Sequence, residues 1–156
     1  MENLENKEKI IQPAIMILSQ YIKDMSVELP LAPQIFKDMT KTPDVKIDFG
    51  MNNQKLDDGN YEVALNVKIN ADIDDKKLFI VELSYAAVAA LDLPEENLEP
   101  VLNIELPRLL FPFVRSIIAN SISDCGLPPI MISPIDFVAL YQAKKAEAEA
   151  KKTKKA

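Results

Sequence analysis

Hydrophobic and polar residues alternate in four stretches of the N-terminal part of the chain. The alternation is clearest at 61–70, where Tyr, Val, Leu, Val and Ile are separated by Glu, Ala, Asn and Lys. The other stretches are 14–29, 45–51 and 78–85. A period of two places successive side chains on opposite faces of a strand. The pattern therefore predicts four strands.

The alternation also predicts which residues share a face of the outer pair of strands. In the first strand, one face carries Tyr21, Met25 and Val27, and the other carries Ile22, Asp24, Ser26 and Glu28. In the fourth strand, one face carries Phe79, Val81, Leu83 and Tyr85, and the other carries Ile80, Glu82 and Ser84. If these two strands are neighbours, their acids form a flat negative surface. An ordinary solvated sheet face is the alternative interpretation.

Two polar turns connect the last three strands. Asp57–Asn60 contains Gly and Asn, which accept positive φ, and Asp74–Lys77 is equally polar. Strands joined by such turns form an antiparallel meander. The segment Pro30–Asp44 is too long for a hairpin turn, and it predicts a crossover over the sheet, as in a Greek key.

After the strands the period changes to that of helices. The segment Pro107–Cys125 has apolar residues at i, i+3 and i+4 spacing on more than one side, and Gly126 provides a stop. Residues 92–107 are predicted to form a loop or a short helix. A last helix is expected to start near Ser133, as N-cap, and Pro134. Strands followed by helices predict an α+β fold, with the helices on one face of the sheet.

Composition divides the chain into three parts. We expect a flexible N-terminus at 1–13, a folded domain at 14–142 and a Lys-rich tail at 143–156. The tail has six Lys and two Glu, a net charge of +4, which leaves −10 for the rest of a chain whose total is −6. A body this acidic repels nucleic acid and attracts basic protein partners. The tail is either a solvated helix end or a contact for anionic lipid or RNA.

The chain lacks the residues on which most catalytic sites depend. It has no His, one Cys, and three isolated glycines, Gly50, Gly59 and Gly126, so imidazole bases, thiolate clusters and phosphate-binding loops are excluded. The acids at 57–58 and 74–75 are explained as turn formers. We expect neither an enzyme nor a bound metal or cofactor. Without a secretion signal or an apolar run of about 20 residues, we expect a cytoplasmic protein without direct membrane insertion.

A second candidate binding feature is a surplus of apolar residues outside the strands. These are Leu31, Ile35, Phe36 and Met39 in the crossover, with Phe137, Leu140 and Tyr141 on the last helix. They form either an apolar binding groove between crossover and helix or a simple cover for the core.

Four motifs, together with YEV at 61–63, resemble those of the SecB family of bacterial protein-export chaperones. They are YIKDMSVE at 21–28 with PLAP at 30–33, LLFPFVR at 109–115, Gly126 with Pro129, and SPIDF at 133–137. The resemblance covers about residues 14–141. The Lys-rich tail departs from the acidic or polar tail common in the family.

The resemblance implies a Greek-key sheet with two helices, assembled as a dimer of dimers. Such a homotetramer interface explains the broad apolar helix, with Leu110, Phe113, Val114 and Ile117 as candidate contacts. It also implies an ATP-independent holdase that binds unfolded precursor proteins and delivers them to the SecA motor ATPase. The family's motor-binding residues match Asp24, Glu28, Ile80 and Glu82 here. A SecB-like chaperone for a dedicated client, such as an antitoxin, is the alternative.

Overall fold

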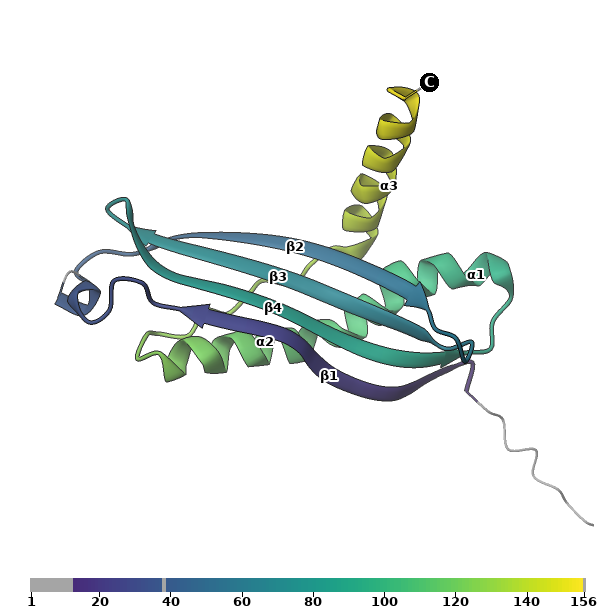
Figure 1. Ribbon diagram of the computed structural model, residues 1–156, viewed down its shortest axis with the longest axis horizontal. Coiled ribbons are helices and arrows are strands. Elements are labelled where there is room, and N and C mark those ends of the chain that lie inside the picture. The colour runs from purple at the N-terminus through teal and green to yellow at the C-terminus, as the bar shows by residue number, and fades with distance from the viewer. Residues whose placement is uncertain (1–12, 38, 156) are drawn as a thin grey trace, which may run out of the picture.

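The computed structural model describes residues 13–37 and 39–155, and it contains one four-stranded antiparallel sheet (Figure 1). The strands are β1 (Ile15–Glu28), β2 (Asp44–Lys55), β3 (Tyr61–Ile73) and β4 (Lys76–Leu91), in the spatial order β1-β4-β3-β2. The last three form the predicted meander, and the crossover joins β1 to the opposite edge. The Greek-key prediction is confirmed. Except for Pro13, the expected flexible N-terminus lies outside the described residues.

Both predicted hairpin turns are present, and each depends on left-handed backbone conformations. Gly59 has a φ of +86°, and the turn between β3 and β4 has Asp74 at +48° and Asp75 at +61°. Asp is among the few residues besides Gly that tolerate this region, and two successive such residues suit a two-residue hairpin. The turn residues therefore fix the register of the meander.

Strand β1 contains a bulge that the sequence pattern did not reveal. The register with β4 shifts between Ile22 and Asp24, because Lys23 has no partner opposite it. Ile22 therefore pairs with Tyr85 on the helix-covered face, and Tyr21 points to the other face. The predicted faces of Tyr21 and Ile22 are wrong, because one extra residue inverts the alternation on one side of a bulge.

The chain is helical from Glu95 to Asp124 in three joined segments. These are α1 (Glu95–Pro100), a π-helical segment at Val101–Glu105 and α2 (Leu106–Asp124). Helix α2 begins at Leu106, one residue before the predicted Pro107, and α1 is the short helix that was one of the two forms predicted for residues 92–107. Pro107 and Pro112 have no N–H to donate, so α-helical hydrogen bonding is interrupted at both without ending the helix.

The end of α2 is the predicted one. Gly126 has a φ of +77°, and its N–H donates to the Ser123 carbonyl at 3.0 Å. The N–H of Leu127 donates to the Ile122 carbonyl at 3.3 Å. This pair of bonds is the Schellman arrangement, which satisfies carbonyls left over at a helix end.

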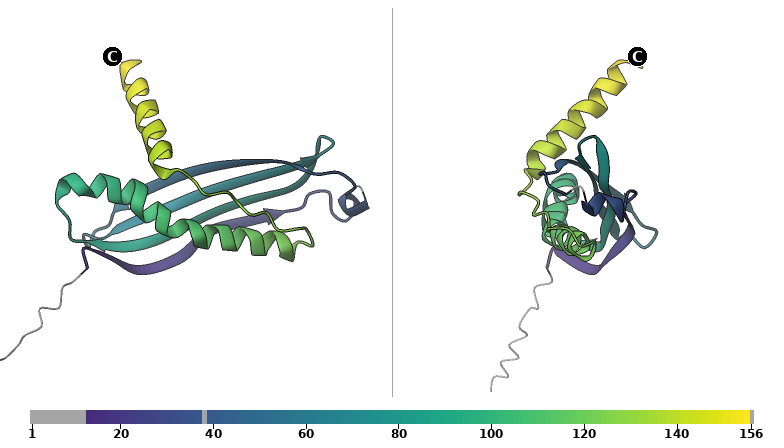
Figure 2. Two further views of the ribbon diagram at one scale, coloured as in Figure 1. Left: turned by 180° about the vertical axis from the view of Figure 1, so that it is seen from behind. Right: turned by 90° about the vertical axis from the view of Figure 1, so that its left-hand side faces the viewer.

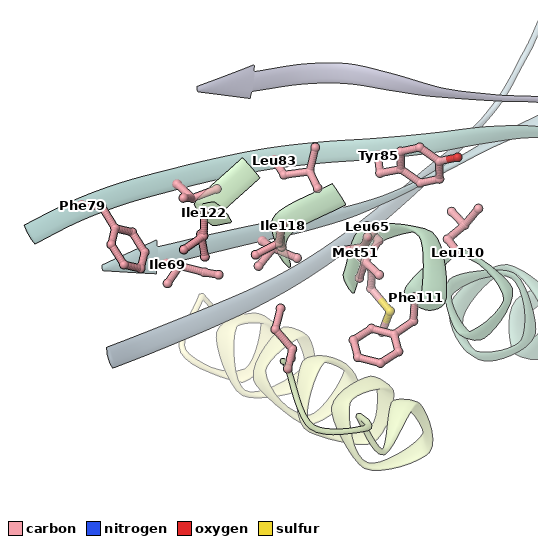
Figure 3. Packing of buried hydrophobic residues seen from close by; sticks show 14 of the residues in the cluster. Met51, Leu65, Ile69, Phe79, Leu83, Tyr85, Leu110, Phe111, Ile118 and Ile122 are labelled. Carbon is pink, nitrogen blue, oxygen red and sulfur yellow. The ribbon is translucent and has the colours of Figure 1, made fainter. Parts of the chain in front are cut away.

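Helix α2 packs across one face of the sheet and forms the core (Figures 2 and 3). The helix contributes Leu110, Val114, Ile118 and Ile122, and the sheet contributes Leu65, Ile69, Val81 and Leu83. Leu110 is 1% exposed and Val114 is 0% exposed. Because both side chains are buried within the single chain, neither is accessible for the predicted subunit interface.

The C-terminal helix contacts the body only near its start. Residues 127–136 run extended along the body, and α3 (Phe137–Thr153) begins with Asp136 as N-cap, whose carboxylate accepts from the Ala139 N–H at 3.0 Å. The predicted N-cap, Ser133, lies outside the helix, where the following Pro134 favours extended backbone. Phe137 packs edge-on against Phe111, and the rest of α3 stands away from the sheet (Figures 1 and 2).

Candidate binding surfaces

The outer face of the sheet, opposite α2, carries the predicted row of acids. Asp24 lies opposite Ser84, Ser26 opposite Glu82, and Glu28 opposite Ile80. The three carboxylates are exposed, and Ile80 is half-buried among them. The prediction that β1 and β4 are neighbours is confirmed, and the two strands present the acids on one continuous surface.

Strands β2 and β3 extend this surface with residues that the sequence did not single out. Lys68 lies opposite Glu82 and pairs with it at 3.3 Å, and Asp48 lies opposite Lys68. Beside this row, Asn66 lies opposite Gly50, and the face has an open depression of about 500 Å³ here. Asp24, Asp48, Lys68 and Glu82 line it. Only the register between strands brings these groups together.

A hydrogen-bonded cluster around Glu62 holds the bulge of β1 to the outer face. Glu62, on β3, is 8% exposed and accepts from Lys23 at 2.6 Å and from Gln54 at 3.1 Å. The hydroxyl of Tyr21 also donates to its carboxylate. The four residues come from β1, β2 and β3, so the cluster spans the sheet. Lys23 forms the bulge, and Tyr21 lies two residues before it. A buried carboxylate needs hydrogen-bond donors such as these two side chains.

The cluster shifts the ionisation of two of its members. The Lys23 ammonium, followed by the Tyr21 hydroxyl, lowers the pKa of Glu62 below its ordinary value of 4.5. Burial, followed by the bond to Glu62, raises the pKa of Tyr21 to about 12. Glu62 is therefore an anion and Tyr21 a neutral donor at neutral pH.

An apolar surface lies on the helix-covered side, along the flank of α2 nearest β1. Leu109 is 52% exposed, Phe113 is 47% exposed and Ile22, on β1, is 48% exposed. Phe113 also stacks on Tyr85 with ring centroids 6.1 Å apart, which fixes its position. Ile117 is partly buried on the same flank. Of the four predicted interface residues, Phe113 and Ile117 are thus on the accessible side of α2.

The predicted client groove is not one groove in the structure. Ile35 and Phe137 are core residues, 1% and 2% exposed, because each fills a gap against the sheet and α2. The crossover lies at one end of the sheet, whereas α3 leaves the body beside β2 (Figure 1). Leu31 and Phe36 remain exposed on the crossover, and Met39, Leu140 and Tyr141 are partly buried.

The described residues hold no group of three or more potential metal-ligating Cys, Asp or Glu side chains. Cys125 is a free, half-buried thiol at the end of α2. Among the described helices none has the length and apolar character needed to cross a membrane. Two of the accessible features described so far are the acidic sheet face and the exposed apolar side chains.

The sheet, the long helix across it and the detached last helix are the fold of a SecB-like chaperone. A SecB-like chaperone of Mycobacterium tuberculosis, in complex with a peptide from an antitoxin, aligns with a TM-score of 0.65 at 13% identity, over 78% of this chain and 91% of that one. The family model of preprotein translocase subunit SecB matches residues 8–148. The chain belongs to the SecB family.

Relatives with high sequence identity carry the name protein-export protein SecB. The Paramagnetospirillum magneticum protein is 50% identical over 139 residues, which cover 88% of this chain and 90% of the relative. The Bartonella quintana protein is 41% identical over 139 residues, or 88% of each chain. The resemblance inferred from the short motifs is confirmed.

Replacing Glu62 with Gln is expected to lower the free energy of unfolding by about 1–3 kcal/mol at neutral pH, because charge-assisted bonds to a buried group are lost. Since folding lowers the pKa of Glu62, its contribution is present above 4.5 and is lost as the pH falls below that value. Urea unfolding of both proteins from about pH 7 to about pH 3 checks this: the difference between them should shrink in acid.

The matched control is Glu82→Gln, because Glu82 is exposed and its pair with Lys68 is solvent-screened. This change should alter stability by no more than about 0.5 kcal/mol. A Glu62→Gln effect as small as the control's would show that the cluster does not hold β1.

Proposed function

We propose that this protein is a holdase chaperone that binds unfolded precursor proteins and delivers them to the SecA motor ATPase for export. Membership of the SecB family carries this proposal. The two kinds of accessible surface support it, because apolar side chains suit many unfolded sequences and an acidic face suits one basic partner. The protein acts in the cytoplasm, where precursors are made.

The mechanism needs no catalysis and no nucleotide. The chain has no His and no Gly-rich phosphate loop, so the energy of release comes from competition by the motor or from folding of the client. Non-directional apolar contact allows capture of unrelated sequences, and the folded client is released because its apolar segments are buried.

The motor contact is assigned to Asp24, Glu28 and Glu82, with Ile80 opposite Glu28. Two observations support this assignment. The four residues lie together on adjacent strands, and Ile80 gives the charged surface an apolar contact. An exposed acidic face accelerates encounter with a basic partner, and that effect is weakened by salt.

Client binding is assigned to the exposed apolar residues of the crossover, Leu31 and Phe36. The Phe36 ring lies beside Gly126, 3.9 Å from where a side chain would begin there, so the crossover abuts the end of α2. Met131, on the extended segment that follows α2, is 67% exposed. Met39, Leu140 and Tyr141 stay candidates at the margins, and Ile35 and Phe137 support the surface from within the core.

A dedicated client, such as an antitoxin, is the second candidate. The fold match to the M. tuberculosis SecB-like chaperone with its antitoxin peptide favours it. The acidic face and the export names of the more similar relatives favour general export.

The assembly is proposed to be a homotetramer, a dimer of dimers. The apolar flank of α2, with Leu109, Phe113 and Ile117, is accessible in the single chain and suits burial against a second copy. The free edge of β1 offers unpaired backbone groups beside it.

Reversal of the acidic face tests the motor contact. The triple variant Asp24→Lys, Glu28→Lys and Glu82→Lys should abolish SecA binding and leave the oligomer intact, because the three side chains are exposed. Calorimetry and light scattering measure the two outcomes. The control is Asp57→Lys, Asp92→Lys and Glu147→Lys, an equal change of charge at exposed sites elsewhere. Unchanged binding by the first variant would remove this face from the mechanism.

The client surface is tested by Leu31→Ser with Phe36→Ser. Loss of two exposed apolar contacts should weaken binding of an unfolded client at least about tenfold, since burial of one such side chain contributes about 1.5–3 kcal/mol. Affinity is measured without nucleotide, with the folded client as a non-binding reference. Ile35→Ser should instead destabilise the fold, because Ile35 is 1% exposed. An unchanged affinity of the double variant would show that the client binds elsewhere.

The assembly is tested by Phe113→Asp, which places a charge on the apolar flank of α2. Light scattering should give a tetramer for the wild type and a smaller species for the variant, because an unpaired charge in an interface is costly. Lys46→Asp, on the exposed outer face, should leave the mass unchanged. A stable 17.5 kDa wild-type monomer at micromolar concentration would refute the tetramer.

A further inference from the structure

The end of α3 is a strongly basic element to which the proposed function assigns no role. The last hydrogen bond from α3 to the sheet is donated by Lys144 to the carbonyl of Met51. Every described residue from Gln142 to Lys155 is exposed, and the helix projects from the body (Figures 1 and 2). We define the basic tip as Lys151, Lys152, Lys154 and Lys155.

The lysines of α3 are arranged on one side of the helix. At 100° per residue, Lys144, Lys145, Lys151 and Lys152 fall within an arc of about 120°. Glu147 and Glu149 lie outside this arc, one on each side. Lys154 and Lys155 follow directly, and positive charge is favourable at a helix C-terminus. At the start of this stripe Lys144 is bonded to the Met51 carbonyl, so the ammonium groups that reach farthest from the body are those of the basic tip.

The projection separates the positive tip from the negative body. Residues 143–156 carry +4 and the remainder of the chain −10. From Lys144 to Thr153 the helix rises about 14 Å, which exceeds the Debye length of about 8 Å at physiological salt. The repulsion between the body and an anionic surface is therefore largely screened when the tip touches that surface first.

The chemistry of the tip selects among anionic partners. Nucleic-acid grooves rely on Arg forks and on aromatic rings that stack on bases. The tip has neither, and residues 143–155 are only Ala, Lys, Glu and Thr. Mobile, hydrated ammonium groups suit diffuse adsorption to lipid headgroups, and Ala side chains give no anchor for insertion.

We propose that the basic tip adsorbs electrostatically to an anionic lipid bilayer, which holds the chaperone near the membrane without insertion. The contact is separate from the acidic sheet face and goes beyond the proposed function, because it requires neither client nor motor. In an oligomer several tips act together, and their weak individual contacts combine.

The experiment is co-sedimentation of the full-length protein with vesicles. Binding is expected to vesicles of phosphatidylglycerol and phosphatidylcholine in equal parts, absent with phosphatidylcholine alone, and lost at roughly 0.5 M salt. Lys151→Gln with Lys152→Gln should reduce the partition coefficient about 25-fold, because each lysine near an anionic surface contributes roughly fivefold. Gln and Lys have similar helix propensities, so the helix content measured by circular dichroism should be the same in the variant and the wild type.

The control is Lys46→Gln with Lys55→Gln, which removes the same charge from exposed positions on β2 and should leave binding unchanged. Equal binding to neutral vesicles, or wild-type binding by the tip variant, would overturn the proposal. Binding to polyuridylate but not to vesicles would assign the tip to nucleic acid and also overturn it. The variant with a reversed acidic face should still bind vesicles, so failure of the proposed motor contact can be distinguished from failure of the proposed lipid contact.

Discussion

The structure depends on the burial of one face of the sheet, and only one, beneath α2. Leu110, Val114, Ile118 and Ile122 reach β3 and β4 and leave the outer face without a cover. An antiparallel sheet covered on one side needs a polar outer face. The acidic surface is thus compatible with the fold at little cost in stability, and its charges are available to a partner.

The same constraint explains the cluster around Glu62. The outer face has no second layer to hold the bulge of β1 in place, so polar contacts must do so. Tyr21 and Lys23 reach across β4 to Glu62 because the intervening Ala86 is small. The bulge affects which side chains face outward: Met25 and Val27 face the core, whereas Asp24 and Glu28 face the outer side. A slip of one residue would exchange these sets.

The sequence predicted the parts of the fold that depend on local chemistry. Alternation identified all four strands, turn residues identified both hairpins, and Gly126 identified the end of α2. It did not predict the bulge at Lys23, because an extra residue leaves no mark on a pattern of period two. It placed the N-cap of the last helix at Ser133, whereas the N-cap is Asp136, because both residue types suit the position. The partnership of Asp48 with Lys68 required the register of two strands.

Residues that are adjacent in the sequence can differ widely in burial, which is why a binding site cannot be predicted without the fold. Leu109 and Leu110 are adjacent and chemically identical, yet one is 52% exposed and the other 1%. Ile35 and Phe36 differ in the same way, with Ile35 in the core and Phe36 at the surface. An apolar residue in the sequence indicates burial, but it does not indicate whether the residue is buried in the chain's own core or against another molecule. The rotation of α2 over the sheet decides which residues are buried, and it leaves Leu109 and Phe113 exposed on one flank. The accessible apolar residues of this protein are therefore those that the packing of α2 and the crossover on the sheet leaves outside the core.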